Sequence, residues 1–271
     1  MEFPEIKKTS RQLNDVLRRK RFVDITLNDQ NDKLIKWGFV NLHKHDIVGL
    51  TIEEVFPRGV YSIVRFEKGE NLVFGDLSGK ILYHPNKSRL PSKYTILFSL
   101  SDKSFLSLQV DQYGFAYALD DNALDNHKYF GKQGLTPNDE VFSYGYFEDV
   151  LSKYSRHHVK KIQFLQNEIS GFQNGYFQDI LLCAGILPYR KISKLTDKEK
   201  TNLFKCMVNT IKNAIELEGS TDEVDIYGHP GKYKRMIGTR IKNRICPKCG
   251  DVFVRKNILG SPSYFCMTCQ H

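Results

Sequence analysis

Long apolar segments are missing from this 271-residue sequence. No run reaches the roughly 18 apolar residues that a membrane-spanning helix requires, so we expect no membrane partner. The opening stretch Met1-Glu2-Phe3-Pro4-Glu5 lacks the features of a secretory signal peptide and of an organellar transit peptide. The chain also has no internal repeat. We therefore expect a cytoplasmic globular protein, for which 41% hydrophobic and 26% charged residues are ordinary values.

Cysteine is scarce, and its distribution is uneven. Four of the six cysteines fall in the last 26 residues. The other two, Cys183 and Cys206, lie in apolar helical patterns, so we expect them to be buried small hydrophobic side chains. Six cysteines, four of them in metal-binding spacing, together with no export signal indicate a reducing cytoplasm.

The four C-terminal cysteines form two Cys-x-x-Cys pairs, Cys246/Cys249 and Cys266/Cys269, separated by sixteen residues. Two such pairs at this distance can hold one tetrahedral zinc ion, with a β-hairpin between them. Two disulfides or four unrelated thiols are the alternatives. A zinc ion with four thiolate ligands has no open coordination position, so this ion would stabilise the segment and take no part in chemistry.

Positive charge is concentrated around this zinc finger. Residues 229–271 contain nine Lys and Arg against one acid, Asp251, a net +8 when the whole chain carries +9. Four thiolates and one Zn²⁺ subtract two charges and leave about +6. By contrast, residues 111–150 carry net −6. Such a segregated patch is typical of a protein that binds a polyanion, most often nucleic acid. An ordinary solvated basic surface is the alternative.

The first half of the chain is predicted to be rich in β-strands after one amphipathic helix over residues 4–20. Short strand-like runs separated by Gly, Asp and Asn favour a β-sandwich over a parallel sheet. These runs cover residues 21–27, 60–66, 72–74, 80–83, 94–100, 105–110 and 113–119.

The second half is predicted to be helical. Helices are expected over residues 148–154, 160–169 and 175–184, and a capping box of Thr196 and Glu199 opens a longer one. The fold class is therefore α+β with several domains. We expect an N-terminal sandwich domain over 1–125, a linker over 126–140, a helical domain over 141–236 and the zinc finger over 237–271.

Three motifs together resemble one family, the formamidopyrimidine-DNA glycosylase and endonuclease VIII family of base-excision repair enzymes. The family's N-terminal pattern Pro-Glu-x-Pro-Glu is similar to residues 1–5 of this chain. Its helix–two-turn–helix motif resembles residues 170–188, and its terminal zinc finger resembles residues 246–270. The motifs occur in the right order and span the whole chain. The resemblance implies a β-rich first half and a helical second half that carries the finger.

The resemblance also implies a chemistry and a set of site residues. The family attacks the sugar C1′ of a damaged nucleotide with its N-terminal amine, displaces the base, and nicks the strand through a Schiff base. Here Met1 takes the place of the nucleophile, and Glu2 and Glu5 are the other catalytic candidates; the two acids could instead only be charges near a helix start. Asn174 is expected to hold a phosphate, or to be a helix N-cap. Further nucleic-acid contacts are expected from Arg58, Leu77, Tyr113, Lys160, Arg240 and Arg255.

The chain departs from the family at several of these positions. Met1 replaces the nucleophilic proline, and because Glu2 follows it, Met1 should be retained and offer a primary amine. Val60 occupies the place of a family lysine, and Ser261 that of the finger arginine. Asp111 falls among the residues that fill the gap in the duplex, and Gln173 replaces a glycine.

Two functions of different classes are compatible with these features. The first is a DNA glycosylase and AP lyase that acts as a monomer on duplex DNA with a lesion or an abasic site, in the cytoplasm or, in a bacterium, at the nucleoid. Its DNA is expected in a basic cleft between the domains. The alternative is a catalytically inactive homologue that binds DNA or structured RNA. A zinc-ribbon protein unrelated to repair would leave the two upstream motifs unexplained.

Overall fold

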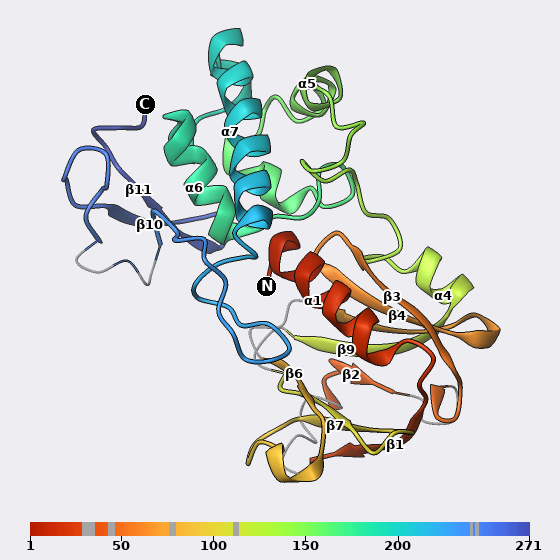
Figure 1. Ribbon diagram of the computed structural model, residues 1–271. Coiled ribbons are helices and arrows are strands. Elements are labelled where there is room, and N and C mark those ends of the chain that lie inside the picture. The colour runs from red at the N-terminus through yellow and green to blue at the C-terminus, as the bar shows by residue number, and fades with distance from the viewer. Residues whose placement is uncertain (29–35, 43–46, 76–79, 111–113, 239–240, 242–243) are drawn as a thin grey trace. The chain divides into compact units, whose positions relative to one another are not determined.

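The computed structural model describes residues 1–28, 36–42, 47–75, 80–110, 114–238, 241 and 244–271. These residues form two compact units (Figure 1). The first contains Met1, residues 3–132 and residues 222–231, and the second contains Glu2, residues 133–221 and residues 232–271. The break after Lys132 falls inside the expected linker. Among the described residues, no helix combines the length and apolar character that crossing a membrane would require.

The first unit opens with helix α1 (Phe3–Leu17), close to the helix expected over residues 4–20. Ile6, Leu13 and Leu17 line its buried face, spaced as an amphipathic helix requires. This face packs against strands β3 (Ile52–Arg58) and β4 (Tyr61–Phe66) (Figure 1).

Two sheets of the first unit share one hydrophobic core, which confirms the predicted β-sandwich. The four-stranded antiparallel sheet has the order β1 (Phe22–Leu27), β7 (Ile96–Leu100), β8 (Phe105–Leu108) and β6 (Ile81–His84). The five-stranded sheet has the order β2 (Val40–Asn41), β9 (Phe115–Asp120), β5 (Glu70–Gly75), β4 and β3, with β2 parallel to β9. The core contains Phe22, Phe98 and Leu106 from the first sheet and Val64, Phe66 and Phe74 from the second.

Strand β3 was not among the predicted strands, and its sequence explains why. Glu53 and Glu54 interrupt its apolar run, and glutamate is depleted in strands. Pro57 near its end further weakens the strand signal. The short helix α4 (Asp121–Asn126) and the two 3₁₀ turns η2 (Glu67–Gly69) and η3 (Lys87–Arg89) complete the first unit.

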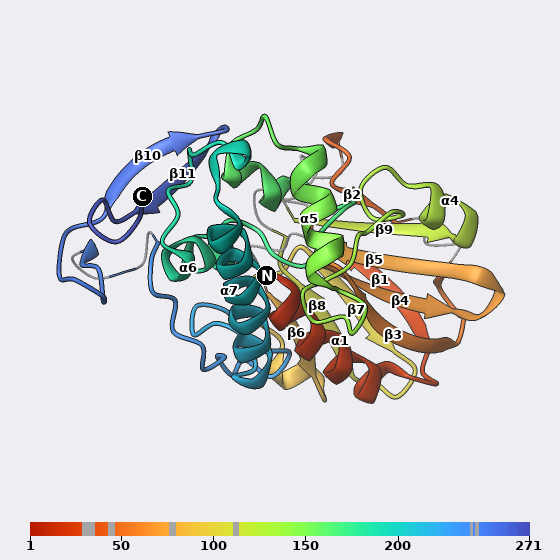
Figure 2. The same cartoon turned by 90° about the horizontal axis from the view of Figure 1, so that it is seen from above.

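The second unit is helical and carries a β-hairpin, as predicted (Figure 2). Its helices are α5 (Tyr144–Lys153), α6 (Asn174–Ala184) and α7 (Asp197–Glu216), with 3₁₀ turns η4 (Val159–Phe164) and η5 (Ile192–Lys194). Its strands β10 (Val254–Ile258) and β11 (Ser261–Phe265) form the hairpin of the finger.

The helix expected over residues 160–169 is wrong in type and in extent. The segment forms the 3₁₀ turn η4, which ends at Phe164. The Gln166 carbonyl oxygen accepts from the Gly134 N–H, and the Ser170 N–H donates to the Leu135 carbonyl oxygen, so the end of the segment pairs with another part of the chain instead of continuing a helix. Tertiary pairing thus overrides the helical periodicity of this sequence.

Helices α6 and α7 lie side by side (Figure 2). Helix α6 ends where Gly185 takes the left-handed conformation, with φ 74°. Helix α7 begins with the predicted capping box, because the Thr196 hydroxyl accepts from the Glu199 N–H and the Glu199 carboxylate accepts from the Thr196 N–H.

The expectation for Cys183 and Cys206 is wrong, because their sulfur atoms form a disulfide between α6 and α7. Both helical patterns were recognised, but neither pattern reveals that the two cysteines face each other across the helix pair. Cys206 is buried, as predicted, while Cys183 is half-buried.

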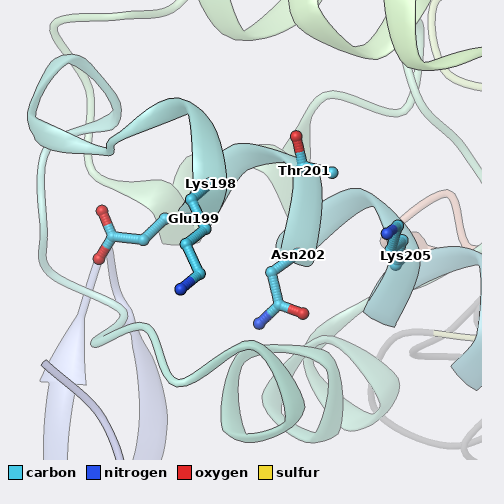
Figure 3. Close-up of a pocket in the computed structure, with 5 residues that line it drawn as sticks. All are labelled: Lys198, Glu199, Thr201, Asn202 and Lys205. Carbon is cyan, nitrogen blue, oxygen red and sulfur yellow. The ribbon is translucent and has the colours of Figure 1, made fainter.

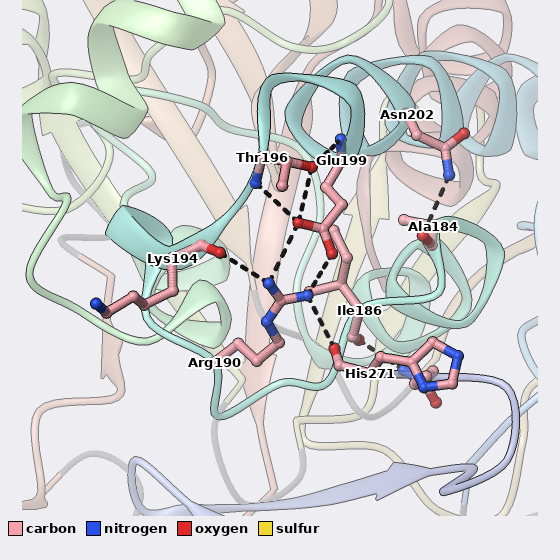
Figure 4. A network of polar contacts seen from close by, with 9 residues as sticks. Ala184, Ile186, Arg190, Lys194, Thr196, Glu199, Asn202 and His271 are labelled. Carbon is pink, nitrogen blue, oxygen red and sulfur yellow. Dashed lines mark hydrogen bonds and ion pairs between the residues drawn. The ribbon is translucent and has the colours of Figure 1, made fainter.

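The C-terminal residues are fixed to this helix pair (Figure 4). The Arg190 guanidinium forms an ion pair with Glu199 and donates to the carbonyl oxygens of Lys194 (2.8 Å) and His271 (3.1 Å). His271 in turn donates its N–H to the Gly185 carbonyl. The second cysteine pair of the finger therefore follows the position of α6 and α7.

Candidate active site and metal centre

The Glu2 carboxylate lies at the N-terminus of helix α6. Its oxygens accept hydrogen bonds from the backbone N–H groups of Gln173 (2.6 Å), Gly175 (3.0 Å) and Tyr176 (3.4 Å). The first N–H groups of a helix have no partner inside the helix, and the helix dipole places partial positive charge there. Glu2 therefore serves as the anion that this helix start attracts. This contact is more specific than the alternative of a charge near the start of its own helix.

Gly175 makes the close approach of Glu2 possible. A Cβ on this residue would lie 2.4 Å from Glu2 Oε1 and 2.6 Å from the Arg235 guanidinium carbon. Both distances are shorter than any real contact of a Cβ atom. With any larger residue at the second position of α6, the Glu2 carboxylate and the Arg235 guanidinium would have to move.

Arg235 lies beside the carboxylate. Its Nη2 is 3.7 Å from Glu2 Oε1, and its guanidinium stacks over the Tyr176 ring, 5.3 Å from the ring centroid. The sequence placed Arg235 only among nine basic residues of the C-terminal segment, with nothing to single it out. No local pattern could have done so, because the contact joins residues far apart in the chain.

Asn174 lies at the same helix start but is not its N-cap. The N-cap is Gln173, so that alternative for Asn174 is wrong. The Asn174 Nδ2 atom donates to the Pro262 carbonyl oxygen at 3.1 Å, which links the first turn of α6 to the tip of the finger hairpin. Its Oδ1 atom is buried and has no hydrogen-bond partner among the described residues.

Lys160 is also directed at the finger hairpin. Its Nζ atom donates to the Ser261 carbonyl oxygen at 3.0 Å and to the Ser263 hydroxyl. The residue is only 1% exposed, and burial lowers the pKa of the Lys160 ammonium from 10.5 to about 8. Lys160 thus supports Ser261, the first residue of strand β11.

The remaining predicted residues are distributed over both units. Met1 and Glu5 are buried, and Glu5 lies in the first turn of α1 in the first unit. Arg58 ends strand β3 and pairs with Asp125 at 3.2 Å, while Arg255 is exposed on β10. The structure thus brings Glu2, Asn174 and Lys160 to one part of the second unit. Leu77, Tyr113 and Arg240, like Asp111, lie outside the described residues.

The four predicted cysteine ligands converge. The sulfur atoms of Cys246, Cys249, Cys266 and Cys269 all lie within 4.8 Å of one another, and two of the pairs are 3.8 and 3.4 Å apart. Four thiolates around one zinc ion at about 2.3 Å stand about 3.8 Å apart, so the cluster fits a tetrahedral zinc site. None of the four forms a disulfide, which rules out the two-disulfide alternative.

A separate hollow lies along helix α7 (Figure 3). It has a volume of about 480 Å³ and is lined by Lys198, Glu199, Thr201, Asn202 and Lys205. Glu199 is already paired with Arg190, and the Asn202 side chain donates to the Ala184 carbonyl oxygen. The hollow shares no residue with the surroundings of Glu2.

Comparisons with known proteins agree with these features. The chain matches no protein-family model. It is 29% identical over 280 residues to a formamidopyrimidine-DNA glycosylase of Pelotomaculum thermopropionicum, covering 99% of this chain and 98% of the relative. A relative of the same name from Carboxydothermus hydrogenoformans is 26% identical over 276 residues, 99% of each chain.

Solved structures share the fold. The MutM (Fpg) protein of Thermus thermophilus superposes with a TM-score of 0.83 at 22% identity, over 100% of this chain and 98% of that one. The Lactococcus lactis Fpg in complex with DNA containing an abasic site superposes with a TM-score of 0.81 at 20% identity, over the whole of both chains. The α+β architecture expected from the sequence is therefore confirmed over the full length.

Proposed function

We propose that the chain is a divergent member of the formamidopyrimidine-DNA glycosylase family and a base-excision repair enzyme, a DNA N-glycosylase and AP lyase. The single observation that carries the proposal is the Glu2 carboxylate, held by three backbone N–H groups at the start of α6. Glu2 is joined by one peptide bond to Met1, whose amine is the proposed nucleophile. A protein that only bound DNA would not need this placement of an acid beside its N-terminal amine.

The proposed chemistry needs no group beyond the N-terminal amine and a proton carrier. An α-amine has a reference pKa near 8, so part of it is unprotonated at neutral pH and can act as a nucleophile. At an abasic site its nitrogen bonds to the sugar C1′ and one water leaves, which gives an imine. Loss of a proton from C2′ then expels the 3′ phosphate and nicks the strand. At a damaged nucleotide the amine first displaces the base from C1′.

Glu2 is proposed to move protons around the sugar during these steps. The N–H groups of α6 fix its two oxygens, so the carboxylate is oriented before the substrate binds. Glu5, buried in the first turn of α1, is the second acid that we propose for this site. The primary amine of Met1, in place of the family's proline, forms an imine that becomes the equivalent iminium ion on taking up a proton.

The DNA partner is proposed to be a duplex with a lesion or an abasic site, bound by one copy of the chain. Asn174 and Lys160 would act near the lesion, one on a phosphate and the other through the finger tip that it supports. The other proposed contacts are Arg58, Leu77, Tyr113, Arg240 and Arg255. Cys246, Cys249, Cys266 and Cys269 would hold a structural zinc ion, which stabilises the finger. A cytoplasmic or nucleoid location remains a prediction.

Strand cleavage tests the proposal. An end-labelled duplex with one abasic site, a duplex with a formamidopyrimidine base and an undamaged duplex are incubated with the full chain. We expect cleavage of the abasic duplex, and of the formamidopyrimidine duplex if the relatives' named substrate is shared. Glu2→Gln should slow cleavage by about a hundredfold. Salt-sensitive binding of all three duplexes without any cleavage would overturn the proposal in favour of a non-catalytic DNA-binding protein.

A further inference from the structure

We infer that Arg235 is a positioning residue for the Glu2 carboxylate and supplies a cation to this site. The effect of Arg235 on catalysis rests on the proposed function. Its effect on the position of Glu2 rests only on the geometry of the second unit. The ion pair joins Arg235 Nη2 to Glu2 Oε1 at 3.7 Å. Both side chains are largely buried, with 21% and 6% of their surfaces exposed, so solvent screens the pair less than it would at the protein surface.

Arg235 is held over the first turn of α6 by its neighbours in the chain. Asp179, a fully buried residue of α6, accepts hydrogen bonds from the Tyr233 hydroxyl (2.8 Å) and from the N–H groups of Met236 (3.0 Å) and Ile237 (3.1 Å). These contacts bracket Arg235 on both sides. The same helix therefore positions the carboxylate through its first N–H groups and the guanidinium through Asp179.

Aromatic stacking restricts the guanidinium further. Its carbon lies 5.3 Å from the centre of the Tyr176 ring, and the ring of Tyr233 packs against Tyr176 at 5.2 Å. A flat guanidinium stacks on an aromatic face more often than the ammonium of lysine does. The arrangement therefore favours arginine at this position.

The Arg235 cation compensates the negative charge of the Glu2 carboxylate. An uncompensated carboxylate would repel the phosphates that flank an abasic site. Arg235 neutralises Glu2, and the positive end of the α6 dipole then favours the approach of an anion.

Two measurements on the same variants test the inference. The first is hydrogen exchange of the Gln173 and Gly175 amides, whose N–H groups donate to Glu2, followed by NMR. The second is the single-turnover rate of abasic-site cleavage at saturating duplex, across pH values from about 5.5 to about 9. The variants are Arg235→Gln, which removes the charge, and Arg235→Lys, which keeps it.

A matched control is available in the first unit. Arg65 pairs with Glu54 at 3.1 Å and stacks over the Phe56 ring at 4.9 Å, the same two interactions at an exposed place on the sheet. Arg65→Gln should leave both measurements unchanged. Zinc content and the thermal unfolding midpoint establish that each variant is folded.

In Arg235→Gln we expect the two amides to exchange at least about tenfold faster and cleavage to slow by about tenfold or more. The acid limb of its pH–rate profile should move to higher pH, since a carboxylate that loses a neighbouring cation is protonated more readily. Arg235→Lys should restore the position of that limb and only part of the rate.

Unchanged amide exchange in a folded Arg235→Gln variant would overturn the inference, and so would a slower rate with an unshifted pH profile. Failure of the proposed function is distinguishable, because the wild-type chain would then cleave nothing. In that case the exchange of the Gln173 and Gly175 amides still decides whether Arg235 positions Glu2.

Discussion

Glu2 and Gly175 are in such close contact that any side chain at residue 175 would collide with the carboxylate, 2.4 Å from the position of its Cβ. The Glu2 carboxylate therefore accepts a hydrogen bond from the N–H group of Gly175, a residue without a side chain. Glu2 and the start of α6 are thus parts of one arrangement, although 171 residues separate Glu2 from Gln173, the nearest donor.

Gly175→Ala is expected to displace Glu2. We expect the free energy of unfolding to fall by about 1–3 kcal/mol, as for other overpacked sites, and cleavage of an abasic duplex to be largely lost. Gly145→Ala in helix α5 is the control, because the nearest atom to its Cβ would be 3.9 Å away. Chemical denaturation and strand cleavage measure the two effects. Wild-type stability and activity in the Gly175→Ala variant would show that Glu2 does not depend on this contact.

Asn174→Ala should weaken the binding of an abasic duplex about tenfold, because the variant loses a side chain proposed to hold a phosphate. Asn202→Ala is the control, because the side-chain amides of Asn174 and Asn202 each donate to a backbone carbonyl oxygen of the second unit at 3.1 Å. Binding titrations at two salt concentrations separate this effect from a loss of general attraction. Equal affinity of the two variants and the wild type would argue against a phosphate role for Asn174.

Lys160 should make the protein more stable at alkaline pH. Its pKa is lowered from 10.5 to about 8 in the folded state, so the unfolded chain binds more protons between these values. Stability should consequently rise as the pH increases through this range, and Lys160→Met should lack this rise. The exposed Lys191→Met variant is the control. Unfolding measured from about pH 7 to about pH 10 checks the sign; a wild-type curve that falls relative to Lys160→Met would contradict it.

Cys249→Ser should release the zinc ion and unfold the finger, because three thiolates and a hydroxyl hold zinc far less tightly. Metal analysis of the purified variant should give a zinc content near zero, against one ion per chain for the wild-type chain, whose four cysteines lie together. Full zinc retention in Cys249→Ser would refute the four-thiolate site.

The features predicted well from the sequence are those that depend on residues close together in the chain. The Cys-x-x-Cys pairs have a spacing that one metal ion requires, and Thr196 and Glu199 are three residues apart, as a capping box needs. Most strands of the sandwich were recognised as short apolar runs bounded by turn residues. Strand β3 was missed because Glu53, Glu54 and Pro57 weaken its strand signal.

The features that were missed depend on contacts between distant segments. The Cys183–Cys206 disulfide forms only because two helices face each other. Arg235 reaches Glu2 because Asp179 holds the residues on either side of Arg235. The burial of the Lys160 ammonium against Ser261 and Ser263 was likewise not foreseen. No property of the local sequence distinguishes such a lysine from an exposed one.

Trapping with borohydride tests the central claim most directly. The full chain is mixed with a duplex containing one abasic site and then reduced, and the product is analysed by intact mass and by mapping of the N-terminal peptide. The account predicts a covalent DNA adduct on the amine of Met1, reduced in amount by Glu2→Gln. An adduct on a lysine, or no adduct despite salt-sensitive binding to the same duplex, would contradict the claim that this chain works through its N-terminal amine.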